Sequence, residues 1–358
     1  MSQFHSLTVA SVKRETRDAI VVTFDVPPEL RETYRFIQGQ YLTLRTTVGS
    51  EDVRRAYSIC SGVGDERLRV AIKRNPGGLF SSWANDSLQA GVAVDVMAPM
   101  GNFYTPLDAD HKKHYLAFAA GSGITPMLSI AKTTLAAEPH SRFTLLYGNR
   151  SSSSVMFRDE LAELKDQYLD RFKLVHVLSR EPHDIDLFHG RIDKQRCDQL
   201  FSSWIDLESV DVAFICGPEQ MMHDVSEALQ AKGFPKAGIK AELFASSTPK
   251  RRDATVQRDV RGNQDCEVTL VIDGAHVSFA MEKDKESVLD AALRQGIDMR
   301  YSCKAGVCST CRCKVVDGKV DMDANYALED YEVARGFALS CQSFPVSDRL
   351  VLDFDQDH

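Results

Sequence analysis

Short runs of alternating apolar and polar residues fill the first part of the chain. Residues 7–12 alternate in this way, and β-branched runs at 19–26, 40–44, 67–72 and 92–97 are bounded by Pro, Gly and Asp. Alternation with period two predicts strands that bury one face. Several short strands at this spacing are typical of a small antiparallel barrel, so we expect residues 1–110 to form one.

The hydrophobic period changes after residue 110. Apolar runs at 114–120, 143–147, 172–178 and 212–216 predict strands, and helical patterns lie between them, beginning at Met127 and spanning 156–168 and 219–232. Strands that alternate with helices predict a parallel sheet covered on both faces. We therefore expect residues 111–245 to form a doubly wound α/β domain.

The chain then becomes polar and basic, without an apolar period, before a third pattern begins. We interpret residues 246–265 as a linker, because such a segment has little apolar surface to bury. From residue 266 the pattern predicts two strands, at 267–272 and 276–280, and an amphipathic helix at 287–295. Residues 266–358 are thus predicted to form an α+β domain.

Four cysteines in this last domain have the spacing of an iron–sulfur site. Cys303, Cys308 and Cys311 follow the pattern C-x4-C-x2-C, and Cys341 comes near the C-terminus. Four thiolates supply two ligands to each iron of a [2Fe–2S] cluster, and this is the plant-type spacing. A structural zinc site is the alternative, but zinc ligands usually come as two short pairs. Cys313 is expected to pack in the core instead of binding metal.

Charge and composition limit the classes of partner. The chain has a net charge of −8, and residues 266–358 hold 10 Lys and Arg against 17 Asp and Glu. An acidic cluster domain disfavours nucleic acid and favours a docking protein. No segment has the length of a membrane span, and the N-terminus lacks a signal-peptide pattern. Nine cysteines with no disulfide spacing suit a reducing compartment, so we expect a cytoplasmic protein.

Two glycine motifs stand where strands of the predicted α/β sheet end. Gly121-Ser122-Gly123 links the strand at 114–120 to a helix, and Cys216-Gly217-Pro218 follows the strand at 212–216. Ligands of such sheets bind at the carboxyl ends of strands. A single G-x-G is weak evidence, but two glycine turns at two strand ends predict a dinucleotide site.

The barrel carries two weaker motifs. Arg55-Ala56-Tyr57-Ser58 matches R-x-Y-S, although a strand with an exposed Arg and a half-buried Tyr would also explain it. Gly77-Gly78 precedes a short helix with hydroxyl side chains, a combination that can hold a pyrophosphate on backbone N–H groups. A plain Gly-Gly turn capped by serine is the simpler alternative.

Together these motifs resemble the ferredoxin–NADP reductase superfamily, followed by a plant-type ferredoxin. The order of flavin, nicotinamide and β-grasp ferredoxin domains resembles the reductases of multicomponent oxygenases, particularly those of diiron epoxidases acting on phenylacetyl-CoA. The resemblance implies that FAD is bound by Arg55, Tyr57, Ser58, Lys73, Gly78 and Ser81. It implies that the nicotinamide nucleotide is bound by Gly121, Gly123, Thr125 and Gly217, that Ser58, Cys216 and Glu242 surround the hydride contact, and that Phe244 covers the flavin.

The strand at 143–147 is followed by a basic, serine-rich segment that bears on coenzyme choice. Arg150, Ser151 and Arg158 lie there, and no acidic residue stands at the strand end to hold a ribose 2′-hydroxyl. We therefore expect NADPH, whose 2′-phosphate these groups could bind. A serine turn that only caps the helix is the alternative.

The implied function is electron transfer from NADPH through FAD and the cluster to an oxygenase. A nicotinamide gives two electrons and a [2Fe–2S] cluster takes one, so a flavin must lie between them. We expect a diiron epoxidase to dock near Cys303 and Cys308, with Lys304, Ala305 and Val307 exposed and Arg300, Lys304, Arg312 and Lys314 giving a positive face. A reductase of a Rieske or other hydroxylase is the alternative, with FMN in some cases, and an electron carrier or sensor without a nicotinamide site is a third.

Overall fold

The computed structural model describes residues 4–182, 184–244 and 264–356, and it contains two compact units. One unit holds residues 5–53 and 57–244, and the other holds the described residues from 264 onward together with Phe4 and residues 54–56. Nearly all of the predicted linker lies outside the described residues. The predicted boundary at residue 110 falls inside one unit and stays a prediction. Among the described helices, none is long and apolar enough to cross a membrane.

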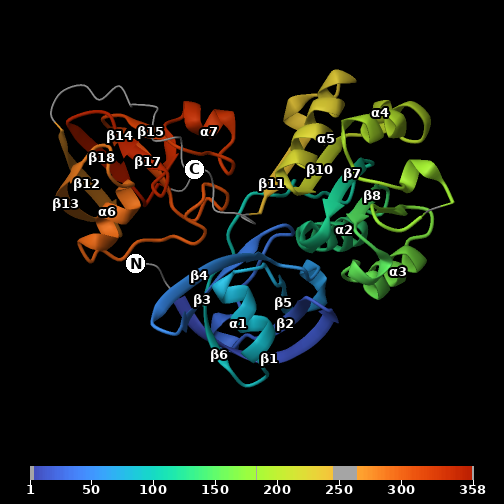
Figure 1. Ribbon diagram of the computed structural model, residues 1–358, viewed down its shortest axis with the longest axis horizontal. Coiled ribbons are helices and arrows are strands. Elements are labelled where there is room, and N and C mark those ends of the chain that lie inside the picture. The colour runs from blue at the N-terminus through green and yellow to red at the C-terminus, as the bar shows by residue number, and fades with distance from the viewer. Residues whose placement is uncertain (1–3, 183, 245–263, 357–358) are drawn as a thin grey trace. The chain divides into compact units, whose positions relative to one another are not determined.

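An antiparallel sheet forms the N-terminal part of the first unit (Figure 1). Its order is β4-β3-β6-β1-β2-β5, and its strands are β1 (Phe4–Thr16), β2 (Ala19–Asp25), β3 (Tyr41–Val48), β4 (Glu51–Ser58), β5 (Leu68–Lys73) and β6 (Ala93–Met97). A bridge between Ile59 and Val70 joins the chain after β4 to β5, so the two edges of the sheet are connected. This confirms the predicted antiparallel β-structure, and helix α1 (Leu79–Ser87) packs on its core through Phe80 and Ala84.

The rest of the first unit is a parallel sheet of order β11-β10-β7-β8-β9 (Figure 1). Its strands are β7 (His114–Ala120), β8 (Arg142–Asn149), β9 (Phe172–Leu178), β10 (Val212–Gly217) and β11 (Ile239–Leu243). The helices are α2 (Ile124–Ala137), α3 (Arg158–Gln167), α4 (Lys194–Ser203) and α5 (Glu219–Ala231). The predicted doubly wound α/β domain is therefore confirmed.

Successive residues of β7 contribute to the cores on opposite faces of this sheet. Tyr115, Ala117 and Ala119 are buried with residues of α2 and α3, whereas Leu116 and Phe118 are buried with residues of α4 and α5. Both faces of the strand are covered, which is why its sequence reads as a continuous apolar run.

The second unit contains a mixed sheet of order β13-β12-β18-β14-β16 and a smaller β15-β17 pair. The strands are β12 (Asp265–Ile272), β13 (Ala275–Glu282), β14 (Arg312–Asp317), β15 (Val320–Met322), β16 (Phe337–Leu339), β17 (Ser343–Pro345) and β18 (Arg349–Asp353). Helix α6 (Val288–Arg294) begins after Ser287, whose hydroxyl accepts from the N–H of Asp290, and α7 is a short helix (Asp330–Ala334). The predicted α+β class is confirmed.

Within the parallel-sheet part of the first unit, three elements differ from the prediction. Helix α2 begins at Ile124, three residues before the predicted Met127, so Pro126 lies in its first turn, where a missing N–H has no cost. Helix α4 and strand β11 were not predicted. Strand β11 is only partly buried, so its sequence lacks the apolar run that marks β7.

Candidate functional site

The glycine turn after β7 lies against the end of β10. Gly121–Gly123 form a short 3-10 turn, and Gly121 has a φ of +54°, which disfavours a side chain. A Cβ on Gly123 would lie 2.1 Å from the carbonyl oxygen of Cys216. Glycine is therefore required here for two strand ends to approach each other.

The second glycine motif is also tightly packed, although its shortest contact is with the end of a flexible side chain. A Cβ on Gly217 would lie 2.5 Å from Cε of Met221 and 3.2 Å from Cβ of Ala120. β7 and β10 are neighbours at the point where the strand order changes direction, which is where open α/β sheets bind nucleotides. The predicted turns are thus brought together at the carboxyl edge of the sheet.

Three side chains proposed for the hydride contact meet beside this edge. Cys216 on β10 pairs in register with Glu242 on β11, and Ser58, the last residue of β4, lies with its Oγ 3.5 Å from Oε2 of Glu242. Cys216 is fully buried. Desolvation raises the pKa of Glu242 to about 8, although the hydrogen bond from Ser58 acts in the opposite direction. The site therefore contains a carboxyl group whose surroundings favour its protonated form.

Tyr147, which sequence reasoning missed, braces the glycine turn. Its hydroxyl donates to the carbonyl of Gly121 at 2.9 Å and accepts from the N–H of Met156 at 3.2 Å. Thr125 Oγ1 also donates to the carbonyl of Ser122 at 3.0 Å. The only available signal was a polar tyrosine inside an apolar strand, next to the strand that precedes the glycine motif. Phe244 is half-buried and packs on the same core.

The residues predicted to bind flavin lie on β4, at the end of β5 and at the start of α1. Tyr57 is half-buried, with its ring centroid 5.5 Å from that of Phe80, and Arg55 is exposed. Ser81 Oγ accepts from the N–H of Asn75 at 3.0 Å and lies 3.3 Å from the carbonyl of Gly78. Ser81 thus ties the turn together, and the N–H of Gly78 itself donates to the carbonyl of Asn75 at 2.9 Å, just before α1 begins.

Lys73 lies beside the glycine turn of the α/β sheet as well as in the barrel. Its Nζ lies 4.0 Å from the position that a Cβ on Gly121 would take, and 3.8 Å from Oδ2 of Asp18. A lysine predicted for the flavin is therefore placed next to the predicted nicotinamide turn.

The serine segment after β8 is a capped turn. The hydroxyl of Ser154 accepts from the N–H of Ser151 at 3.1 Å and donates to its carbonyl at 2.7 Å, which is the capping arrangement that the sequence left open. Arg150 is exposed. Arg158 is the first residue of α3. Burial lowers the pKa of His176 on β9, and the positive charge of Arg158 lowers it further. An acidic residue missed in the sequence, Glu181, reaches this turn from the loop after β9.

The four cysteines of the C-terminal domain gather as two interacting pairs. Cys303 hydrogen-bonds with Cys308, and Cys311 with Cys341. The bond from Cys308, followed by backbone N–H groups, lowers the pKa of Cys303 to about 6 despite its burial. Among the described residues, no three or more His, Cys, Asp or Glu side chains are grouped so that they could hold one metal ion. Two thiol pairs are the donor set of two irons, so the residues fit a [2Fe–2S] cluster.

Donor groups surround these sulfurs. The N–H of Ala305 lies 3.3 Å from Sγ of Cys303, and Thr310 Oγ1 lies 3.3 Å from Sγ of Cys308. Such hydrogen bonds stabilise negative charge on cluster ligands. Cys313 is buried, and its thiol donates to the carbonyl of Ala338 at 3.5 Å, in keeping with the predicted packing role.

The exposure predicted for Ala305 is wrong, and the positive charge predicted around the cluster loop is partly neutralised. Ala305, which lies within the cysteine loop between Cys303 and Cys308, is only 1% exposed. Three of the four basic side chains are paired with acids: Lys304 Nζ with Asp290 at 2.9 Å, Arg312 with Glu332 at 3.3 Å and Arg300 with Asp273 at 3.9 Å. Lys304 is exposed as expected, and Val307 is partly exposed.

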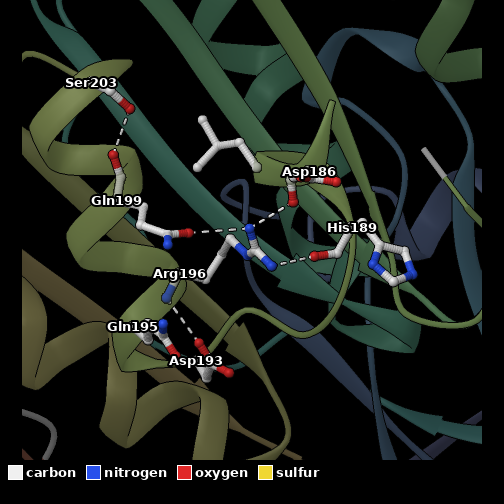
Figure 2. A pocket seen from close by; sticks show the side chains of 8 residues that line it. Asp186, His189, Asp193, Gln195, Arg196, Gln199 and Ser203 are labelled. Carbon is white, nitrogen blue, oxygen red and sulfur yellow. Dashed lines mark hydrogen bonds between the residues drawn. The ribbon is translucent and has the colours of Figure 1, made fainter. Parts of the chain in front are cut away.

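A surface cavity of about 560 Å³ lies between α4 and the loop that follows β9 (Figure 2). Its central side chain is Arg196, whose guanidinium donates to the carbonyls of Asp186 and His189 at 2.6 and 2.5 Å, and to Gln199 at 3.2 Å. Arg196 is thus used to hold a loop on a helix.

Comparison with known proteins agrees with this architecture. Family models match for an oxidoreductase FAD-binding domain at residues 6–104, an oxidoreductase NAD-binding domain at 118–227 and a 2Fe-2S iron-sulfur cluster binding domain at 270–346. The chain is 49% identical to a subunit of the 1,2-phenylacetyl-CoA epoxidase of Escherichia coli (strain K12), over 99% of both chains. It is 35% identical to the ferredoxin reductase component of 3-ketosteroid-9-alpha-monooxygenase of Rhodococcus rhodochrous, covering 97% of this chain and 96% of that one.

The fold also agrees with a solved reductase. Phthalate dioxygenase reductase, described as a modular structure for electron transfer from pyridine nucleotides to [2Fe-2S], aligns with a TM-score of 0.55 at 27% identity and covers 98% of each chain. With its three domains matched in order and its glycine turns and thiol pairs assembled, the chain belongs to the family of FAD- and NAD-binding iron–sulfur reductases that serve oxygenases.

Proposed function

We propose that this reductase passes electrons from NADPH, through FAD and a [2Fe–2S] cluster, to a diiron epoxidase that acts on phenylacetyl-CoA. The observation that carries the proposal is the 49% identity to one component of a phenylacetyl-CoA epoxidase, maintained over 99% of both chains. Identity over the whole length includes the cluster domain, which is the part that meets the electron acceptor.

The flavin residues are proposed from their positions on the barrel. Arg55 would pair with a phosphate, because guanidinium–phosphate contacts are strong and bidentate. Tyr57 would stack on the flavin ring, and the N–H groups in the first turn of α1, after Gly78, would hold the pyrophosphate with Ser81. Lys73, whose ammonium lies beside Gly121, would serve the phosphates from the barrel side.

The nicotinamide residues are proposed from the edge of the parallel sheet. Gly121, Gly123 and Thr125 would hold the pyrophosphate, and Gly217 would admit the nicotinamide. When bound, the flavin accepts a hydride from the reduced nicotinamide and delivers electrons singly to the cluster. Ser58 would orient the Glu242 carboxyl, whose raised pKa favours the protonated form. Cys216 closes the floor of the site, and Phe244 would cover the ring and exclude water.

NADPH is proposed over NADH on charge. Arg150 and the turn beginning at Ser151 offer a guanidinium and hydroxyl and N–H donors of the kind that bind phosphate. Arg158 is the weaker candidate, since its charge acts on His176 of β9.

The partner is proposed to dock at the edge of the cluster loop, around Cys303 and Cys308. Because three nearby basic side chains already pair with acids, the docking charge is smaller than the sequence indicates. We propose a cytoplasmic location, where the cysteines outside the cluster would stay reduced.

Reconstitution tests the proposal. This protein, NADPH, oxygen, phenylacetyl-CoA and the purified oxygenase components of the epoxidase should give the epoxide, and omission of any one component should abolish it. Reduction of ferricyanide by NADPH is the control, because it requires no oxygenase.

The second candidate is the reductase of another oxygenase. It is favoured by identities of 35–37% to the reductase components of 3-ketosteroid-9-alpha-monooxygenases. If the epoxidase stays inactive while such a monooxygenase is reduced readily, this candidate replaces the first, and the electron-transfer function stands in both cases.

A further inference from the structure

One serine of the turn after β8 presents two donors to a carboxylate. The hydroxyls of Ser151 and Ser153 lie 3.0 Å apart and bond to each other, and Ser154 caps the turn. Ser152 instead donates its N–H to Oε2 of Glu181 at 3.0 Å and its hydroxyl to Oε1 at 3.1 Å. Each oxygen of Glu181 therefore has its own donor, and the turn already holds an anion supplied by the chain itself.

The loops after β8 and β9 run side by side at this point. The N–H of Ser179 donates to the carbonyl of Asn149 at 3.0 Å, and that of Arg180 to the carbonyl of Arg150 at 2.9 Å. Arg150 and Arg180 are both exposed. Within the described residues, neither guanidinium has a hydrogen bond or ion pair. Two unpaired cations thus stand next to the turn that Glu181 occupies.

The loop that carries Glu181 is held at both of its ends. At its start, Ser179 and Arg180 extend the pairing of β8 with β9. At its end, the N–H of Gly190 donates to the carbonyl of Leu178 at 2.9 Å. Arg196 on α4 binds the carbonyls of Asp186 and His189 (Figure 2). Because these anchors do not involve Glu181, its side chain can leave Ser152 while the loop keeps its place.

The donors that hold Glu181 are those that an incoming phosphate would use. A backbone N–H and a serine hydroxyl on a turn are typical ligands of phosphate oxygens. A phosphate dianion and a carboxylate cannot share them, because like charges a few ångströms apart repel. A ribose 2′-hydroxyl carries no charge and can donate a hydrogen bond to the carboxylate. Acidic residues in NAD sites accept such a hydrogen bond from this hydroxyl.

We propose that Glu181 determines coenzyme specificity, its carboxylate occupying the Ser152 turn as a built-in competitor of the 2′-phosphate of NADPH. NADPH must displace it, gaining Arg150 and Arg180 in return, whereas NADH leaves it in place. Glu181 therefore lowers the preference for NADPH below the level that the two arginines would set. This inference rests on the proposed nicotinamide-dependent function.

A purely structural role makes a different prediction. If Glu181 only stiffens the serine turn, its loss should change the reactions with NADH and NADPH by the same factor. Competition for the phosphate site should change their ratio. Glu181→Gln separates the two, because the amide oxygen can still accept from Ser152 while the negative charge is gone.

The first experiment measures kcat/KM for NADPH and NADH with ferricyanide in the holoenzyme. Glu181→Gln should raise the NADPH/NADH ratio roughly tenfold, the effect of about 1.4 kcal/mol from one ionic contact. The matched control is Glu163→Gln, an exposed acid on α3 of the same domain, which should leave the ratio within about twofold. An unchanged ratio in Glu181→Gln overturns the proposal, as does a shift toward NADH.

The second experiment measures binding directly, by calorimetry of adenosine 2′,5′-bisphosphate with the holoenzyme. Glu181→Gln should tighten binding, Ser152→Ala should weaken it in the Glu181→Gln background, and 5′-AMP, which lacks the 2′-phosphate, should bind both proteins equally. Equal binding of the bisphosphate to wild type and Glu181→Gln would contradict the competition. If neither nucleotide reduces the flavin, the proposed function fails, while this measurement still decides the role of Glu181.

Discussion

Glu242 differs from most carboxyl groups in that its surroundings favour the protonated form at neutral pH. Burial raises its pKa from 4.5 to about 8, and Cys216 beside it in the β10–β11 register is fully buried. The Ser58 hydroxyl at 3.5 Å is too distant to offset this loss of hydration. A neutral acid next to the proposed hydride contact adds no net charge to the site.

This raised pKa predicts how stability depends on pH. The protonated form is favoured in the folded state, so the contribution of Glu242 is fully present below pH 4.5 and is lost as pH rises to about 8. Denaturation from pH 5 to 9 should show wild type losing stability relative to Glu242→Gln over this window. Parallel curves for the two proteins would mean that Glu242 has an ordinary pKa.

At the scale of elements, a closed ring of four charges joins the antiparallel sheet to the helices of the parallel sheet. Lys132 on α2 contacts Asp65 at 2.5 Å and Glu160 on α3 at 2.9 Å, while Arg69 on β5 contacts Glu160 at 2.6 Å and Asp65 at 3.7 Å. The side chains are only 18–25% exposed. Each charge therefore has two partners of opposite sign, in surroundings that screen them weakly.

Breaking this ring should destabilise the first unit. Glu160→Gln leaves Lys132 and Arg69 with one acid between them, and we expect a loss of about 1–3 kcal/mol, between the values for exposed and buried pairs. Denaturant unfolding measures the difference in the free energy of unfolding between Glu160→Gln and wild type, and added salt should make this difference smaller. Glu32→Gln is the matched control, because its pair with Arg35 is about 80% exposed on both sides, and it should cost less than about 0.5 kcal/mol. Equal effects of the two substitutions would show that the ring contributes nothing.

At the scale of the whole molecule, the turns proposed for the nicotinamide and the cysteines proposed for the cluster belong to different compact units. Each unit has its own buried core, one including Leu128 and Phe143, the other including Leu289 and Leu352. A unit with its own core can fold and act when the other is damaged. Hydride transfer and single-electron transfer should therefore be separable by mutation.

Cys303→Ser tests this separation. It removes one cluster ligand, so the visible absorption of the cluster should be lost, while flavin absorption and NADPH-dependent ferricyanide reduction should stay within about twofold of wild type. Turnover with the oxygenase should disappear. The modular account fails if ferricyanide reduction is lost although the flavin is retained.

Local sequence was sufficient wherever a pattern has one structural solution. The continuous apolar run at 114–120 became β7 with the predicted bounds, because a strand covered on both faces needs apolar residues at each position. The glycines at 121, 123 and 217 were identified from their place at strand ends, and the structure gives a reason for two of them: Gly123 lies against the backbone of Cys216, and Gly121 has a positive φ. The C-x4-C-x2-C spacing predicted the cysteine site, since thiol ligands close together in sequence cannot be far apart in space.

Long-range pairing was decided by the tertiary structure alone. The meeting of Ser58 with Glu242, the proton held on that carboxyl, the pairing of Lys304 with Asp290 and the approach of Glu181 to Ser152 all join segments that are distant in sequence or separated by a loop. A sequence shows which charges exist, but a charge is neutralised, buried or left free by its neighbours in space. The sequence therefore determined the domains and their chemical class, and the packing of strand ends and loops determined the protonation, the charge and the proposed coenzyme preference of the sites.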